Sequence, residues 1–293
     1  MTNTEKPVAL ITGAAAGLGW GLAEYFFLQG YQLFLVDRDA QALNDKVALL
    51  AGSASSDAQK VVAHCVDLIA PESEPIEQLV VNFHAHFSEL AVLVNNAGIT
   101  HRSLAQNTDI AVTRRVLALD FLVPVELTQA LLPALLRYGD AHRSAIILNI
   151  GSMAGWMPVV ARSGYCAAKS ALHQYFETLR AELAQQPVHI LMVYPSFLAT
   201  DIEKNALSGT GQPAQHARST IGGVHSVDWM VVRIGKALRR RRARLFPNRS
   251  IALASIFYRL WPTLFLTLMR KKFAQEWQVG EPNKPSLQAG GTQ

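Results

Sequence analysis

Cysteine is scarce in this 293-residue chain, and recognisable targeting or repeated segments are missing from it. The two cysteines, Cys65 and Cys166, lie far apart and form no metal-binding or redox motif, so a reducing, cytoplasmic location is expected. Residues 1–7 are few and polar, so neither a signal peptide nor a transit peptide is expected. Internal repeats and low-complexity domains are also missing, which excludes repeat architectures.

Acidic residues are missing from residues 229–275, which hold twelve of the 27 Lys and Arg and none of the 22 Asp and Glu. The rest of the chain is therefore acidic, although the whole chain carries a formal charge of +5. Half of the residues are hydrophobic, and the length suits one large α/β domain. We expect that domain over residues 1–250, a basic and apolar helical extension over 251–276, and a disordered tail over 277–293.

A glycine-rich turn follows the first apolar run of the sequence. Residues 8–12 have the pattern of a strand and residues up to 29 that of an amphipathic helix, with Gly13, Gly17 and Gly19 between them. Glycines let the backbone approach a pyrophosphate, which binds the N–H groups at the helix N-terminus. The strand–turn–helix context favours a dinucleotide site over a plain tight turn.

Asp37 ends the second predicted strand, eighteen residues after Gly19. A carboxylate at this position can accept hydrogen bonds from both hydroxyls of an adenosine ribose, and it repels a 2′-phosphate. Ala16 is not basic and offers no cation to such a phosphate. The sequence therefore favours NAD over NADP, although Arg38 follows directly and can weaken the preference.

Strands alternate with helices through most of the chain, which predicts a parallel sheet covered on both faces. The strands are predicted at residues 8–12, 31–36, 61–66, 91–94, 145–150, 189–194 and 243–246, and the later helices at 40–50, 75–87, 108–138 and 165–186. The third strand leads into Asp67 and Leu68, which are placed to flank an adenine ring.

Tyr165 and Lys169 stand four residues apart, so on a helix they lie on one face, one turn from each other. An ammonium close to a phenol lowers the phenol pKa from about 10 toward neutrality, which suits a general acid/base. Ser152 lies thirteen residues before Tyr165, directly after an apolar strand. Its hydroxyl can donate to a substrate oxygen on which charge develops.

Together these motifs resemble the short-chain dehydrogenase/reductase family. The matching residues span residues 8–202 and are Thr12-Gly13-xxx-Gly17-x-Gly19, Asp67, Asn95-Asn96-Ala97-Gly98, Ser152, Tyr165-xxx-Lys169, and Pro195 with Thr200. The resemblance implies a Rossmann doubly wound sheet of about seven parallel strands. It also implies hydride transfer between a nicotinamide and an alcohol or ketone, and a homodimer or homotetramer built on the two long helices.

The resemblance further assigns roles to residues. It makes Tyr165 the acid/base, gives Lys169 the tasks of lowering its pKa and binding the nicotinamide ribose, and lets Ser152 position the substrate oxygen. It places the cofactor against Gly13, Ala15, Gly17, Leu18, Gly19, Asp37, Asp67, Leu68, Asn95, Ala97, Gly98, Tyr165, Lys169, Pro195, Leu198 and Thr200. No metal site is predicted.

Asp120 departs from the family pattern, in which an asparagine holds a water that relays protons to the lysine. A carboxylate can hold the same water and pair with Lys169, or it can hold Lys169 too tightly. We therefore count Asp120 among the catalytic candidates. The alternative to an active enzyme is a catalytically impaired NAD(H)-binding sensor or scaffold.

Apolar residues are expected around the substrate. Trp156 and Met157, the 198–223 loop and the pair His101–Arg102 would lie there in such a fold, which favours a lipophilic alcohol or ketone. Ordinary lid packing is the alternative reading of Trp156 and Met157. The stretch from Thr200 to Leu207 resembles the subgroup that includes hydroxysteroid and retinol-type dehydrogenases.

Residues 251–269 contain a single charge, Arg259. Nineteen helical residues would just reach across a thin hydrocarbon core, but Arg259 and Pro262 disfavour a stable span. Basic flanks fit a helix lying in an anionic membrane surface, and residues 251–272 are the candidate contact. Packing on the protein's own sheet, on a second subunit or at the pocket mouth stays open. Nucleic acid is not expected, because the arginines come with no aromatic platform or DNA-binding motif.

Overall fold

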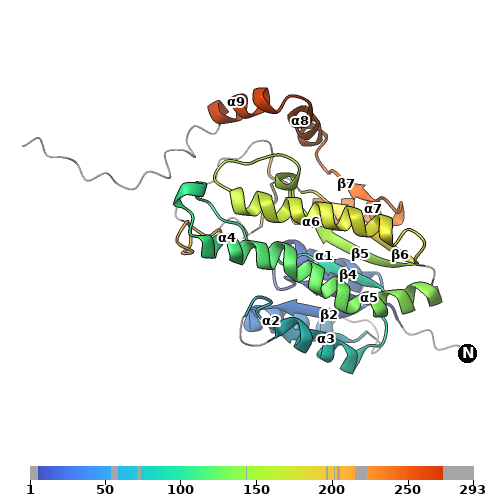
Figure 1. The fold of residues 1–293 in the computed structure, drawn as a ribbon. Helices are drawn as coiled ribbons and strands as arrows, with labels where there is room; N and C mark the ends of the chain where they lie inside the picture. Colours follow the sequence, from blue (N-terminus) through green and yellow to red (C-terminus); the bar gives the residue numbers. More distant parts are fainter. Residues whose placement is uncertain are drawn as a thin grey trace, which may run out of the picture.

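The computed structural model describes residues 6–53, 59–70, 74–142, 144–195, 197–200, 202, 205–214 and 223–272. The predicted disordered tail, residues 277–293, lies outside this part of the chain. The described residues form a central sheet with helices on both faces, and two C-terminal helices lie beyond it (Figure 1).

The sheet has seven strands in the order β3-β2-β1-β4-β5-β6-β7, and each neighbouring pair is parallel. The strands are β1 (Val8–Thr12), β2 (Gln32–Asp37), β3 (Val61–Cys65), β4 (Val92–Asn95), β5 (Ala145–Ile150), β6 (Val188–Val193) and β7 (Arg244–Leu245). Strands buried on both faces need continuous apolar runs, and β1 is buried at all five positions. The predicted doubly wound Rossmann sheet of about seven strands is confirmed.

Two helical layers cover the sheet, each with its own hydrophobic cluster. One layer contains α1 (Gly17–Leu28), α2 (Ala40–Ser53) and α7 (Val227–Arg239). The other contains α3 (Pro75–His86), α5 (Val123–His142) and α6 (Ser163–Glu182), with α4 (Ile110–Leu117) leading into α5. Figure 1 shows α5 and α6 side by side in front of the sheet, with α1 behind it. The helix α7 was not predicted; Ser226 caps it by accepting from the Trp229 N–H at 3.2 Å.

The predicted helix over residues 108–138 is present but irregular. It consists of α4, a π-helical turn at Ala118–Leu122, and α5. The continuous stretch Ile110–His142 is the one helix in the described residues that is long and apolar enough to cross a membrane. Its side chains Leu127, Leu131 and Leu135 are fully buried in the cluster against the sheet, which is the packing of a core helix.

The expected C-terminal helical extension is present, and it is divided into two helices. The helices are α8 (Arg249–Leu260) and α9 (Pro262–Lys272), and the chain bends at Trp261. Pro262 has no N–H to donate into the preceding turn, but it fits the first position of a new helix. Neither helix alone is long enough to cross a hydrocarbon core.

The strand order reverses between β1 and β4, which are neighbours although the chain leaves them in opposite directions. In open α/β sheets the crevice at such a switch point receives ligands at the carboxyl ends of the strands. Thr12 Oγ1 ties these ends together, because it donates to Val94 O at 3.2 Å and accepts from the N–H groups of Asn96 and Ala97, each at 3.0 Å.

Candidate active site

A cavity of about 850 Å³ opens at the carboxyl ends of the strands. It is lined by most of the residues predicted from the sequence, namely Gly13, Ala15, Gly17, Leu18, Asp37, Asp67, Leu68, Ala97, Gly98, Ser152, Met157, Tyr165, Lys169, Pro195, Leu198 and Thr200. The fold therefore brings the glycine turn and the Ser–Tyr–Lys set, which are more than 130 positions apart in sequence, to one cavity.

The glycine turn leaves room for a phosphate. Gly13 and Gly17 have φ angles of +67° and +54°, which residues that carry a side chain rarely adopt. A Cβ on Gly19 would lie 1.9 Å from the Gly13 carbonyl oxygen, so Gly19 serves the close packing of α1 on the turn and does not itself line the cavity. The first turn of α1 has no side-chain cap at Ala16. Its N–H groups thus fit a pyrophosphate.

Asp37 is fixed at the far end of the cavity by backbone donors. Its Oδ2 accepts from the Ala15 N–H at 3.0 Å and its Oδ1 from the Asp39 N–H at 3.1 Å. Arg38 also lines the cavity. A carboxylate held beside the glycine turn is in the position to accept hydrogen bonds from an adenosine ribose. The residues present therefore fit a dinucleotide.

The Ser–Tyr–Lys set lies at the other end of the cavity. Tyr165 and Lys169 occupy successive turns of α6, and Lys169 Nζ lies 5.8 Å from the centre of the Tyr165 ring. Lys169 also donates to the carbonyl oxygen of Ile150 at 3.1 Å, which aims its ammonium at the end of β5. Ser152 Oγ accepts from the Ala154 N–H at 3.1 Å, and its side chain is hydrogen-bonded to that of Tyr165, which lowers the pKa of the phenol.

Asp120 lies behind this set, in the π-helical turn, and does not line the cavity. Its side chain is fully buried, and Oδ2 lies 3.1 Å from Lys169 Nζ, whose side chain is 6 % exposed. Oδ1 accepts from the Ile99 N–H at 2.8 Å. A carboxylate in place of the family asparagine thus forms a direct, buried ion pair with the lysine.

The pKa of Tyr165 differs from the sequence expectation. Burial raises it above its usual value, Lys169 lowers it, and Asp120 raises it again. Burial lowers the pKa of Lys169, but Asp120 and Tyr165 outweigh this and raise it. In the protein by itself, the phenol is therefore more weakly acidic than usual, chiefly because it is buried, and Asp120 also opposes the effect of the Lys169 charge. The predicted lowering by Lys169 is present, and burial outweighs it.

His101 positions the start of α6. It is completely buried, and its Nε2 accepts from the Gly164 N–H, the residue before Tyr165, at 3.0 Å. Its Nδ1 therefore carries the proton and points at Ser103 Oγ, 3.2 Å away. Burial, together with Arg162, lowers the pKa of His101 to about 4, so it is neutral at physiological pH. It was expected around the substrate, but it does not line the cavity.

Three other predicted residues, Asn95, Arg102 and Trp156, do not line the cavity, and Arg102 is buried. Asn95 is the last residue of β4 and is buried, and its amide donates to Asn149 Oδ1 at 2.8 Å. Trp156 was expected near the substrate but packs into an aromatic cluster, with its ring centre 5.4 Å from Tyr194 and 5.2 Å from Phe246. This agrees with the packing interpretation of Trp156.

Sequence reasoning did not assign several lining residues. Arg115 and Arg162 carry charge into the cavity wall, and Phe197 lies directly before the 198–223 loop. Ile202 and Asn205 belong to that loop, which was expected there as a whole. The C-terminal helices contribute Ser250, Ala254, Phe257, Phe265, Leu268 and Met269. The signal that could have found this last set was the apolar extension itself. The sequence left the pocket mouth open as one of the places where that extension could pack.

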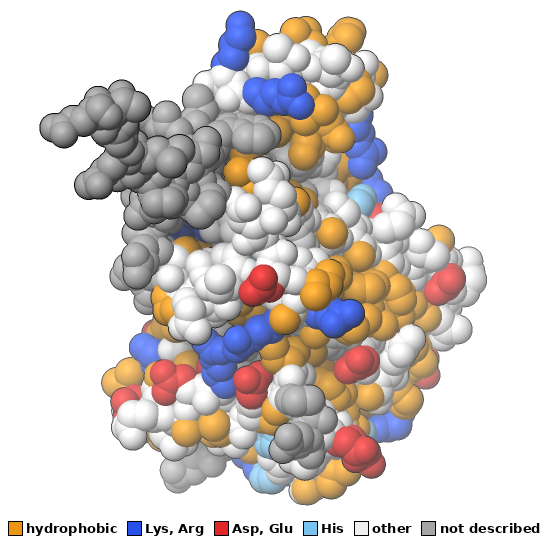
Figure 2. Space-filling view, turned by 60° about the vertical axis from the view of Figure 1, so that its left-hand side comes forward, with side chains coloured by type: hydrophobic (Ala, Val, Ile, Leu, Met, Phe, Trp, Pro, Cys, Tyr) orange, Lys and Arg blue, Asp and Glu red, His pale blue; other side chains and the backbone are white. Residues whose placement is uncertain are grey.

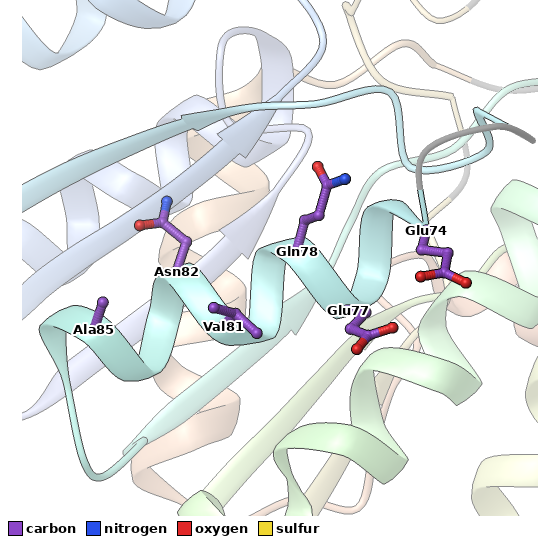
Figure 3. Close-up of a pocket in the computed structure, with 6 residues that line it drawn as sticks. All are labelled: Glu74, Glu77, Gln78, Val81, Asn82 and Ala85. Atoms are coloured by element: carbon purple, nitrogen blue, oxygen red, sulfur yellow. The ribbon is translucent and has the colours of Figure 1, made fainter.

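A second, shallower hollow of about 480 Å³ runs along the outer side of α3 (Figure 3). All six lining residues, Glu74, Glu77, Gln78, Val81, Asn82 and Ala85, come from this helix or the residue before it. None belongs to the glycine turn or to the Ser–Tyr–Lys set, so the reaction is assigned to the larger cavity.

A doubly wound sheet with a glycine cradle and a tyrosine–lysine pair at its switch point defines a dinucleotide-dependent oxidoreductase. The family model described as short chain dehydrogenase matches residues 7–210. This chain belongs to the short-chain dehydrogenase/reductase family, and it is an NAD(P)-dependent oxidoreductase.

Related sequences and solved structures agree. The bovine dehydrogenase/reductase SDR family member 7B is 30% identical over 270 residues, covering 92% of this chain and 82% of that one. The dehydrogenase/reductase SDR family protein 7-like of Drosophila melanogaster is 30% identical, and the match covers 90% of this chain and 80% of that one. A short-chain dehydrogenase from Sphingobium yanoikuyae in complex with NADPH has a TM-score of 0.71 at 24% identity, covering 96% and 99%. A short-chain dehydrogenase/reductase from Burkholderia phymatum in complex with NAD has a TM-score of 0.73 at 21% sequence identity, and the match covers 97% of this chain and 99% of that one. At these identities the structures support the fold alone.

Proposed function

We propose that this protein transfers a hydride between a nicotinamide cofactor and a lipophilic alcohol or ketone, with Tyr165 as the general acid/base. The observation that carries the proposal is the convergence of Ser152, Tyr165 and Lys169 on one wall of the cavity that also contains the glycine cradle. The lipophilic substrate is supported by the remaining wall, where Met157, Phe197 and residues of α8 and α9 are apolar.

A bound nicotinamide supplies the hydride acceptor or donor in this chemistry. In alcohol oxidation the Tyr165 oxygen takes the proton of the substrate hydroxyl, and Ser152 donates to the same substrate oxygen and fixes its position. Lys169 favours the phenolate by its charge. The adenosine end would be held by Asp37 and the pyrophosphate by the first turn of α1.

NAD is the proposed cofactor, in preference to NADP. The Asp37 carboxylate is fixed by two backbone N–H groups beside the glycine turn, so it cannot easily turn away from a 2′-phosphate. Arg38, the next residue in the chain, also lines the cavity and can reduce this repulsion. Purified protein should therefore reduce NAD more readily than NADP with the same alcohol.

The test is a panel of lipophilic secondary alcohols and ketones assayed with both cofactors, together with the variant Tyr165→Phe. We expect this variant to lose about 10²–10⁴-fold in turnover while cofactor binding is kept, because the acid/base oxygen is lost and the cradle is not. Tyr175→Phe, on the same helix, is the matched control, since its hydroxyl only accepts from Gln129 at 3.2 Å. Normal turnover in Tyr165→Phe would overturn its assignment.

A second candidate function has one specific observation in its favour. The buried ion pair between Asp120 and Lys169 compensates the charge that would otherwise acidify Tyr165. A catalytically impaired NAD(H)-binding sensor or scaffold would bind NADH and turn over no member of the panel. A gain of turnover in Asp120→Asn would show that the carboxylate restricts an otherwise complete site.

Assembly and location complete the proposal. A homodimer or homotetramer would use α5 and α6, the long helices that lie side by side on one side of the sheet (Figure 1). The protein would be cytoplasmic, with peripheral membrane contact through residues 251–272. Light scattering of the purified protein measures the first, and its distribution between soluble and membrane fractions of cells measures the second.

A further inference from the structure

The C-terminal helices form part of the catalytic cavity and at the same time a surface of their own. On the inner side, Ala254 and Phe257 of α8 and Phe265 and Met269 of α9 line the cavity. The two helices pack on each other through aromatic rings, with Phe265 6.2 Å from Phe257 between ring centres. The pair therefore covers the cavity mouth as a lid.

The outer side of this lid is apolar and uncovered. Seven of the fifteen exposed large hydrophobic side chains among the described residues lie on these two helices or at the bend between them, namely Leu253, Ile256, Leu260, Trp261, Leu264, Leu266 and Leu268. Leu253 and Leu260 expose 65 % and 61 % of their surface, and with Ile256 they follow the spacing of one helix face. Such a concentration marks an interaction surface.

Charge identifies the partner. Arg270 and Lys271 lie in the last turn of α9, Arg249 begins α8, and residues 229–275 contain no Asp or Glu. Figure 2 shows basic and hydrophobic side chains together on this protruding part of the molecule. A second copy would bring the same cations against each other, because a two-fold interface pairs identical surfaces. An anionic lipid surface complements both the charge and the apolar face.

Arg259 would be misplaced on a membrane-facing side, but it points to the protein body. Its guanidinium lies 4.4 Å from the centre of the Trp156 ring, four residues after Ser152. This cation–π contact anchors α8 at the rim of the active site and keeps the arginine away from the lipid side. Leu268 lies at the boundary, because it both lines the cavity and is 50 % exposed.

We propose that α8 and α9 form a lid that lies in the surface of an anionic bilayer, so that substrate dissolved in the bilayer enters the Tyr165 cavity from the lipid side. The substrate class is then a membrane-soluble alcohol or ketone with a long apolar chain. The use of this entrance rests on the proposed function, that is, on the proposed reaction. The docking of the lid on the membrane does not depend on that reaction.

The docking is tested by flotation of the full-length protein with phosphatidylcholine vesicles, with and without phosphatidylserine. We expect binding to the anionic vesicles only, and release by high salt. The double variant Leu260→Glu with Leu264→Glu should lower vesicle partition on the order of a hundredfold or more, since neither residue lines the cavity and both face outward. Val232→Glu, an equally exposed apolar residue on α7, is the control that should float like the wild type.

Turnover separates the docking from the reaction. With a long-chain secondary alcohol in anionic vesicles, the double variant should lose turnover, and with a short water-soluble secondary alcohol it should match the wild type. No flotation of the wild type, or equal flotation of the double variant, overturns the proposal. A dimer in light scattering that the double variant dissociates also overturns it, in favour of a subunit contact. Flotation without turnover of either alcohol would leave the docking supported and refute the proposed reaction.

Discussion

The substitution Asp120→Asn probes the feature in which this site departs most from its family. It removes the charge that lies 3.1 Å from Lys169 Nζ and keeps a side chain of almost the same shape. At an effective dielectric of about 20, two unit charges at this separation attract each other by about 5 kcal/mol. Part of this attraction offsets the desolvation of two buried groups, so the net loss is smaller.

We expect Asp120→Asn to lower the free energy of unfolding by roughly 3 kcal/mol, the lower end of the range for breaking a buried pair. The amide oxygen can still accept from the Ile99 N–H, and Lys169 still donates to the Ile150 carbonyl, which limits the cost. A loss of this size lowers the melting temperature by about 6–12 °C. Urea unfolding and thermal melts measure both quantities.

The same substitution should change the pH dependence of the reaction. Asp120 raises the pKa of Tyr165 and Lys169 lowers it, so removing the carboxylate leaves the lysine charge uncompensated. The pH profile of kcat/KM for alcohol oxidation should then move to lower pH. Asp109→Asn, at an exposed residue just before α4, is the control that should leave both profile and stability unchanged. An unmoved profile in Asp120→Asn would refute the role given to the ion pair.

Three further predictions concern the cofactor and the fold. Asp37→Ala should abolish a preference for NAD that we expect to be at least about tenfold, or 1.4 kcal/mol, in binding titrations; equal affinities in the wild type would contradict it. Gly19→Ala should lower cofactor affinity and stability, because its Cβ would meet the Gly13 carbonyl at 1.9 Å, whereas Gly52→Ala, with nothing within 4 Å, should do neither. His101 has a pKa of about 4 when folded and about 6.5 when unfolded, so stability is full above pH 6.5 and falls by about 3 kcal/mol toward pH 4. Denaturant titrations at several pH values in this window measure the free energy of unfolding. In His101→Gln this free energy should fall less as the pH is lowered.

The sequence by itself was enough to predict the sheet and most of the cavity wall. Continuous apolar strands alternating with helices leave few topologies, and the parallel sheet then places the residues after each strand at one edge. Thus Gly13, Asp37 and Ser152 could be assigned to one site although they are far apart in the chain. Spacing alone also placed Tyr165 and Lys169 on one helix face.

The tertiary structure decided what depends on the direction of side chains and on long-range packing. Asp120 could pair with Lys169 or hold a water, and only the approach of the π-helical turn to α6 gave the direct ion pair. Trp156 follows Ser152 closely, but its ring packs with Tyr194 and Phe246, the residues directly after β6 and β7, and with Arg259 of α8, away from the cavity. An apolar segment must bury its surface somewhere, but its composition does not say against which part of the protein, subunit or membrane it packs. The position of α8 and α9 over the cavity mouth therefore required the folded chain.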